Sequence, residues 1–199
     1  MRYQRQIIGY HGCLKDTFEA ALVNGTHPTP SSSHTDWLGT GVYFWEYGPN
    51  RALEWAKQKA IRAGRSTDDA RVLGAVIQLG SCFDLLDTEA TDLLSLAFAD
   101  LTSTLAPGTE LPKNTTPARL IAESGHPDVL LRARDRAVIE LAIDTEAAAD
   151  PPTFYQTVRG AFWEGGAAFP GAAIEKRSHI QVSVRDMTCI IGYFKPVPV

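Results

Sequence analysis

The stretch from Asp36 to Ala56, DWLGTGVYFWEYGPNRALEWA, carries the clearest structural pattern in the chain. Residues 41–45 form a short aromatic and β-branched run next to a glycine, which is typical of a strand. The following segment, 50–63, places small and apolar side chains on one face. It starts after Pro49 and ends before Gly64, so we expect an amphipathic helix.

Within the predicted strand, Tyr43 and Trp45 share one face and Phe44 lies on the other, because successive side chains of a strand alternate. Aromatic faces that line a cleft are suited to stacking on a planar ring. The alternative is that all three rings belong to the hydrophobic core.

The other elements follow in a mixed order. Strands are predicted over residues 6–10, 41–45, 71–79, 157–163, 179–185 and 190–194. Helices are predicted over residues 15–23, 50–63, 89–105 and 130–143. Because strands open and close the chain while helices fill its middle, we expect an α+β fold with a largely antiparallel, split sheet.

Composition sets the broad class. The 199 residues are 44% hydrophobic and carry a formal charge of −4, so a single domain over residues 1–199 is expected and a wide basic surface for nucleic acid is not. No signal peptide is recognisable, and no apolar run reaches the roughly 18 residues of a membrane span. The three cysteines lack metal-type spacing. We therefore expect a cytoplasmic protein with free thiols, no metal and no membrane partner.

Two further patches place polar residues on predicted strands. In Gly9-Tyr10-His11-Gly12, a titratable side chain stands between glycines, which let a ligand approach the backbone closely. The alternative is a histidine that only caps a strand end. In the late strand, His179, Gln181 and Ser183 share one face, and the alternative there is an ordinary solvent-facing side of a sheet.

Together these patches resemble the ADP-ribosyltransferases, in particular the diphtheria-toxin and poly(ADP-ribose) polymerase branch. The resemblance rests on a strand ending Tyr10-His11-Gly12, on Gly39-Thr40-Gly41-Val42-Tyr43-Phe44 leading into an alanine-faced helix, and on a late strand with a polar residue. The matching motifs occur in the same order along nearly the whole chain. The chain also resembles a group of uncharacterised bacterial proteins that are thought to share this fold. The branch carries a His–Tyr–Glu signature on three separate strands.

The resemblance implies an NAD site. His11 would bond the adenosine-side ribose, the Gly12 backbone would hold the nicotinamide amide, and Tyr43 would stack on the nicotinamide ring. Trp45 and Ala52 complete the expected NAD-binding set; Ala52 and Ala56 would let their helix pack closely beneath the site. The loop over residues 163–174 stands where the family carries its target-recognition loop.

The third signature position departs from the family, because Gln181 stands where the family has glutamate. That glutamate bonds the nicotinamide ribose and stabilises a cation-like transition state, whereas glutamine brings no charge. Three outcomes follow. Gln181 suffices for slower transfer; a carboxylate from Glu46, Glu164 or Glu175 supplies the charge; or the domain binds NAD or ADP-ribose without catalysis.

The expected function is therefore an NAD-dependent mono-ADP-ribosyltransferase, with His11, Tyr43 and Gln181 as the catalytic set. The acceptor would be a protein or a nucleic acid; attack by water would instead make the chain an NAD glycohydrolase. Arg159, Arg177 and Arg185 are candidate phosphate or target contacts, the alternative being arginines that are simply solvated. A bacterial toxin or effector role is compatible, with an antitoxin or immunity protein as its partner. The RNA 2′-phosphotransferase branch would need a second histidine in place of Tyr43.

Overall fold

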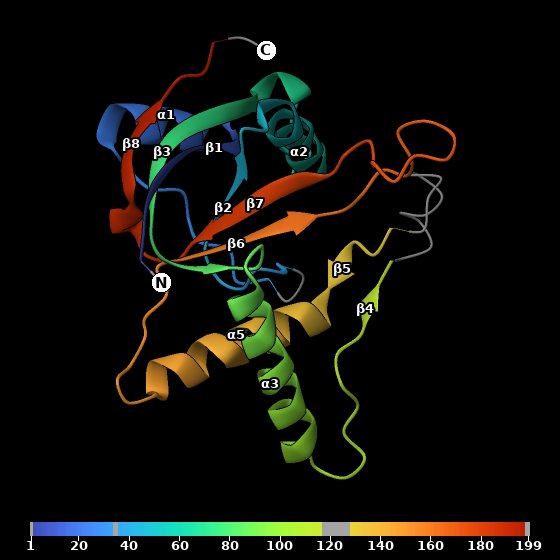
Figure 1. Ribbon diagram of the computed structural model, residues 1–199. Coiled ribbons are helices and arrows are strands. Elements are labelled where there is room, and N and C mark those ends of the chain that lie inside the picture. Colours follow the sequence, from blue (N-terminus) through green and yellow to red (C-terminus); the bar gives the residue numbers. More distant parts are fainter. Residues whose placement is uncertain (1, 34–35, 117–127, 198–199) are drawn as a thin grey trace.

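The computed structural model describes residues 2–33, 36–116 and 128–197 (Figure 1). Its strands are β1 (Arg2–Leu14), β2 (Val42–Glu46), β3 (Ala70–Asp84), β4 (Asn114–Thr115), β5 (Leu131–Arg132), β6 (Thr157–Phe162), β7 (His179–Val184) and β8 (Ile190–Phe194). Its helices are α1 (Lys15–Asn24), α2 (Pro49–Arg62), α3 (Thr88–Thr104) and α5 (Ala133–Ala148), with 3₁₀ turns at Thr67–Asp69 and Met187–Cys189.

Local sequence explains where the helices begin and end. α2 starts with Pro49 at its first turn, where a missing N–H costs nothing. α3 is capped by Asp87, whose side chain accepts a hydrogen bond from the backbone N–H of Glu89. α1 ends at Gly25, which has the left-handed backbone (φ 67°) that favours glycine.

Five strands close into a ring. β1 pairs with β2, β2 with β7, β7 with β6, β6 with β3, and β3 returns to β1, while β8 adds to the other side of β3. Every pairing is antiparallel except β3 with β6, which is parallel. The inner side of this ring holds one hydrophobic core, built around Phe44, Ile77 and Val182.

The helices cover the outside of the ring. α2 packs on β1 and β3, and α3 packs on α5 below β6 and β7 (Figure 1). A second core lies between the outer face of β2, β7 and β6 and these lower helices, with Trp37, Phe83 and Ile139 among its residues. A third, small core joins α1 to β1 and β3 through Cys13, Ala21 and Leu73.

The α+β class and each predicted helix and strand are confirmed, with shifts at the ends. β1 and β3 are longer than expected, and β3 continues through Gly80 instead of stopping there. The expectation of a largely antiparallel sheet holds apart from the parallel β3–β6 pairing.

Candidate functional site

The three residues of the predicted signature lie on three adjacent strands. His11 is on β1, Tyr43 on β2 and Gln181 on β7, and the sheet runs in the order β1–β2–β7. Trp45 lies directly opposite Gln181, and Tyr43 directly opposite Ser183. Tyr43, Trp45, Gln181 and Ser183 therefore share the face of the sheet that points away from the ring, which we call the outer face.

The ladder between β1 and β2 is short. It joins Gly9 to Glu46 and Tyr10 to Trp45, and does not continue to His11 and Gly12. At this point Nδ1 of His11 lies 2.8 Å from the backbone oxygen of Tyr43. The imidazole thus bridges two strands whose regular pairing has ended. The expected split into two half-sheets is not seen, because the strands close into one ring.

The environment of His11 fixes its protonation. Partial burial beside Phe44, at a ring-centroid distance of 5.6 Å, lowers the pKa of His11 to about 4. The ring is neutral at pH 7, and because a carbonyl only accepts, Nδ1 carries the proton. Nε2 is therefore left as a hydrogen-bond acceptor. His11 shares its face with Phe44, on the inner side of the ring, so it approaches the gap from the side opposite to Gln181.

Small residues bring α2 against β1 beside this gap. A Cβ atom on Gly12 would lie 2.2 Å from the backbone oxygen of Ala52 and 3.1 Å from the nitrogen of Ala56, so only glycine fits. Ala52 and Ala56 are fully buried. The predicted close packing of this helix is confirmed, and Ala52 contacts the Gly12 position directly.

Tyr43 is tied to the segment that precedes its strand. Its hydroxyl donates to the backbone oxygen of Gly39 at 2.8 Å and accepts from the N–H of Leu38 at 2.9 Å. Burial raises the pKa of this phenol. The ring is thus held by its polar end, and it packs against the second hydrophobic core.

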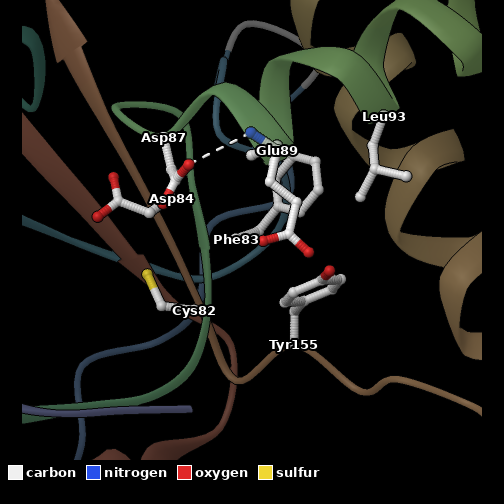
Figure 2. A pocket seen from close by; sticks show the side chains of 8 residues that line it. Cys82, Phe83, Asp84, Asp87, Glu89, Leu93 and Tyr155 are labelled. Carbon is white, nitrogen blue, oxygen red and sulfur yellow. Dashed lines mark hydrogen bonds between the residues drawn. The ribbon is translucent and has the colours of Figure 1, made fainter. Parts of the chain in front are cut away.

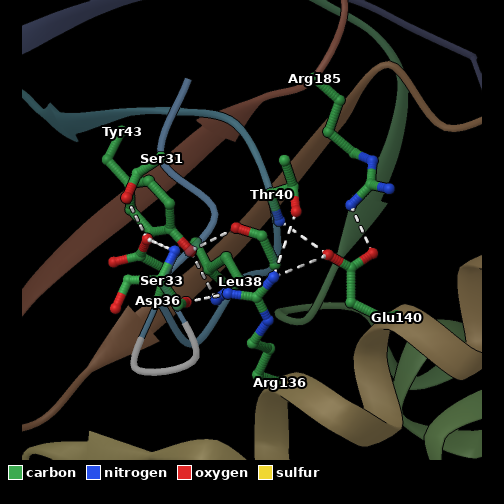
Figure 3. Close-up of polar contacts among 10 residues, drawn as sticks. Ser31, Ser33, Asp36, Leu38, Thr40, Tyr43, Arg136, Glu140 and Arg185 are labelled. Carbon is green, nitrogen blue, oxygen red and sulfur yellow. Dashed lines mark hydrogen bonds and ion pairs between the residues drawn. The ribbon is translucent and has the colours of Figure 1, made fainter. Parts of the chain in front are cut away.

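Helix α5 anchors the same segment (Figure 3). Glu140 accepts from the N–H of Thr40 at 2.7 Å and from Arg185, at the end of β7, at 2.8 Å. Arg136 bonds the backbone oxygen of Ser33 and the hydroxyl of Thr40. This network, which was not expected from the sequence, links the segment that holds Tyr43 to the strand that carries Gln181.

Gln181 is oriented by an indole. Nε1 of Trp37 donates to Oε1 of Gln181 at 2.7 Å. Because an indole N–H only donates, the amide oxygen must face Trp37, and the amide NH₂ of Gln181 faces elsewhere. Trp37 was not among the predicted site residues, and no local sequence signal distinguishes it from a core tryptophan.

A polar cluster lies at the start of β7. His179, 6% exposed at its side chain, stacks on Phe162 at 5.5 Å and lies 6.1 Å from the ring of Trp45. Its Nδ1 is 3.6 Å from a carboxylate oxygen of Glu164, which forms an ion pair with Arg51. Burial lowers the pKa of His179 to about 4 and raises the pKa of Glu164. The alternative of a solvent-facing strand is wrong for His179.

The three carboxylates considered as a charge source have different surroundings. Glu46 belongs to a buried group inside the ring, where Arg159 bonds it at 2.6 Å and bonds Asp84 at 3.0 Å. Glu164 lies beside His179. His179 is two residues before Gln181 on the same face of β7. Glu175 stands in the loop between β6 and β7, with a buried oxygen lacking a partner among the described residues. Glu164 thus lies next to a residue that shares the strand face of Gln181.

The three arginines considered as phosphate or target contacts also have different surroundings. Arg159 is 5% exposed on a central strand, so it is neither a solvated edge residue nor a free phosphate contact. Arg185 is engaged by Glu140. Arg177, in the loop before β7, donates its backbone N–H to the backbone oxygen of Glu164.

Two cavities lie away from these residues. One, of about 20 Å³, sits between the end of β3 and the start of α3, lined by Asp84, Asp87, Glu89 and Tyr155 among others (Figure 2). It has room for about one water molecule. The other, of about 310 Å³, lies between the C-terminal end of α1 and β8 and has no lysine or arginine in its lining. A helix C-terminus disfavours phosphate, so neither cavity suits a dinucleotide.

Comparison of the chain with protein-family models, curated proteins and solved structures found no match. Within the described part of the chain, no helix is long and apolar enough to cross a membrane. No group of three histidine, cysteine or acidic side chains among the described residues is arranged to hold a metal ion.

Proposed function

We propose that the chain binds NAD at the gap between β1 and β2 and transfers its ADP-ribose to an acceptor with release of nicotinamide. The observation that carries this proposal is the end of the β1–β2 ladder after Tyr10 and Trp45, with His11 bridging to the backbone of Tyr43. A sheet that opens between two strands offers backbone groups to a ligand, and the residues at this opening are those that resemble the ADP-ribosyltransferase signature.

The adenosine side of NAD would meet His11. With Nδ1 committed to the Tyr43 carbonyl, Nε2 is an acceptor, and a ribose hydroxyl is a donor that suits it. The backbone of Gly12, where no side chain intervenes, would bond the carboxamide of nicotinamide. Both roles use atoms that the β1–β2 ladder does not engage.

The nicotinamide side would meet the aromatic rings of β2. The Tyr43 ring is held at its hydroxyl by Leu38 and Gly39, so its orientation is fixed before a ligand binds. Such preorganisation lowers the entropic cost of stacking a planar ring. Trp45 lies on the same outer face, opposite Gln181, and would border the ribose.

Cleavage of the glycosidic bond builds positive charge on the ribose. Gln181 brings no charge, and at 4 Å an ionised carboxylate would contribute about 4 kcal/mol in a moderately screened site. Glu164, which is ion-paired with Arg51, is a candidate on the same side of the sheet, whereas Glu46 is paired with Arg159 inside the ring. This arrangement supports slow mono-ADP-ribosyl transfer rather than extension of an ADP-ribose chain.

The family resemblance also suggests the acceptor, the cellular location and the biological role. A protein or nucleic-acid acceptor, a cytoplasmic site of action and a toxin or effector role with an immunity partner all rest on it alone. The catalytically inactive alternative, an NAD- or ADP-ribose-binding module, is favoured by one observation: the amide oxygen of Gln181 is already engaged by Trp37.

A thermal-shift measurement with NAD tests the binding site. NAD at about a hundred times its Kd should raise the Tm of the wild type by roughly 5–10 °C for a domain of this size. His11→Asn keeps a donor near the Nδ1 position but removes the Nε2 acceptor, so it should fold normally and lose most of the shift. His27→Asn, at an exposed histidine beside Tyr193, is the matched control and should keep the shift. Absence of any shift in the wild type would refute the site; a shift without nicotinamide release would leave the binding module.

A further inference from the structure

Several buried polar side-chain atoms in the described part of the chain have no hydrogen-bond partner, and three of them belong to neighbouring residues near the start of β7. Among the described residues five buried side-chain atoms have no hydrogen-bond partner: Trp45 Nε1, Arg51 Nε, Glu175 Oε2, His179 Nε2 and Ser183 Oγ. Leaving such an atom unpaired costs roughly 1–3 kcal/mol, and native proteins contain few of them. Three such atoms on the linked residues Trp45, Arg51 and His179 therefore point to a group that this part of the site receives.

Three of these atoms belong to residues joined by direct contacts. The rings of Trp45 and His179 are 6.1 Å apart, and Glu164 joins His179, at 3.6 Å, to Arg51 by an ion pair. Trp45 and His179 are each about nineteen-twentieths buried. The side chain of Arg51 is 21% exposed, so the cluster reaches the surface at this residue.

The hydrogen-bonding pattern of these three atoms defines the missing group. Nδ1 of His179 lies 2.7 Å from the backbone oxygen of Arg177, which only accepts, so the proton is on Nδ1 and Nε2 offers a lone pair. Trp45 and Arg51 offer N–H donors. A hydroxyl carries one donor and two acceptor lone pairs, and it satisfies two donors and one acceptor at once.

We infer that this cluster, Trp45, Arg51 and His179, receives the hydroxyl group that accepts ADP-ribose, with His179 taking its proton. The inference rests on the proposed function. His179 precedes Gln181 by two residues on the same strand face, about 7 Å along β7, which places the hydroxyl beside the ribose.

The step balances as a substitution at the anomeric carbon. The bond from this carbon to the nicotinamide nitrogen breaks, and its electron pair leaves with nicotinamide, which becomes neutral. The hydroxyl oxygen forms the new bond to carbon, and its proton moves to Nε2 of His179. Glu164, 3.6 Å from Nδ1, stabilises the imidazolium until the proton passes to solvent.

Water and a hydroxyl-bearing side chain or sugar share this chemistry, and the products separate them. Wild-type protein is incubated with labelled NAD, with and without cell extract. Free ADP-ribose formed without extract identifies water, whereas mass spectrometry of labelled macromolecules identifies a serine, threonine or sugar oxygen. Either product supports the inference. Attachment at carboxylate, guanidinium, thiol or ring nitrogen overturns it.

Variants test the proton transfer. His179→Gln keeps an acceptor but cannot take a proton, and product formation should fall about a hundredfold or more while the NAD-induced thermal shift remains. Trp45→Phe, which removes the indole N–H and keeps a smaller aromatic ring, should lose about tenfold. His27→Gln is the matched control and should match the wild type. An undiminished rate in His179→Gln overturns this inference alone, whereas absence of NAD cleavage in the wild type overturns the proposed function as well.

Discussion

The indole nitrogen of Trp37 donates a hydrogen bond to the side-chain oxygen of Gln181 at 2.7 Å. The two residues are 144 positions apart, and the bond sets which end of the Gln181 amide faces the neighbouring residues of the outer face. The oxygen faces Trp37, so the NH₂ is the end of the amide that faces away from Trp37 and can donate to a ligand. A glutamate at this position would keep the same bond through one oxygen and present a charged second oxygen to the ligand.

We therefore expect Gln181→Glu to accelerate NAD cleavage by roughly ten- to a hundredfold, because the added charge stabilises the cation-like ribose. Nicotinamide release at saturating NAD is the measurement. Gln58→Glu on the exposed face of α2 makes the same chemical change away from the site and should have no effect. A rate that stays at the wild-type value in Gln181→Glu would show that Gln181 does not face the ribose.

The close approach of α2 to β1 makes Gly12 intolerant of any side chain. Gly12→Ala would place Cβ 2.2 Å from the backbone oxygen of Ala52, so the helix must move. We expect the free energy of unfolding to fall by roughly 2 kcal/mol or more. Gly192→Ala, on β8 with no atom within 4 Å of its Cβ position, is the matched control. Urea unfolding of both variants checks the difference, and equal midpoints would contradict the described packing.

The two buried histidines should make stability depend on pH. Burial lowers the pKa of both His11 and His179 from 6.5 to about 4. Between these values the unfolded chain binds more protons than the folded one, so stability is complete above pH 6.5 and is lost as the pH falls. From pH 6.5 to 5 we expect a loss of up to about 2 kcal/mol per histidine.

Urea unfolding at pH 7.5, 6 and 5 measures this slope. His179→Gln should unfold with a flatter pH dependence than the wild type. His27→Gln, at an exposed histidine, should leave it unchanged. A wild-type slope that His179→Gln does not alter would mean that His179 titrates normally in the folded protein.

The cysteines should be unreactive in the folded state. Cys13, Cys82 and Cys189 are all free and buried. Burial raises the pKa of the Cys13 and Cys82 thiols to about 12 and that of Cys189 to about 11, so almost no thiolate forms at pH 8. A thiol reagent at pH 8 should modify the native protein only as fast as the chain unfolds. In denaturant the same reagent should modify all three thiols. Ser32→Cys, on an exposed segment, is the positive control. Rapid reaction of native wild-type thiols would contradict their burial.

Much of the fold is predictable from local sequence, because periodicity and turn residues act over short distances. The helix after Pro49 and the alternation that sets Tyr43 and Trp45 against Phe44 are examples. The order of pairing is not local. The closure of β1 onto β3 and the parallel pairing of β6 with β3 depend on contacts between distant segments, and so does the burial of Arg159 between Glu46 and Asp84.

The candidate site, like the fold, was predictable from the sequence only in part. The placement of His11, Tyr43 and Gln181 on three separate strands was expected from the family resemblance. The short β1–β2 ladder brings His11 beside the backbone of Tyr43. His179 looked like a solvent-facing strand residue, because its alternation with Ile180 resembles an ordinary half-exposed strand. It is buried because Trp45 of β2 and the segment Phe162 to Glu164 at the end of β6 surround it, and these are two distant parts of the chain.

Release of nicotinamide from NAD labelled in the nicotinamide ring tests the central claim most directly. The wild type should release label, with and without cell extract as a source of acceptor. Tyr43→Ala, which removes the stacking ring, should lose at least tenfold, whereas Tyr47→Ala, at an exposed tyrosine outside the outer face, should retain the wild-type rate. Wild-type protein that releases no nicotinamide under either condition would contradict the account.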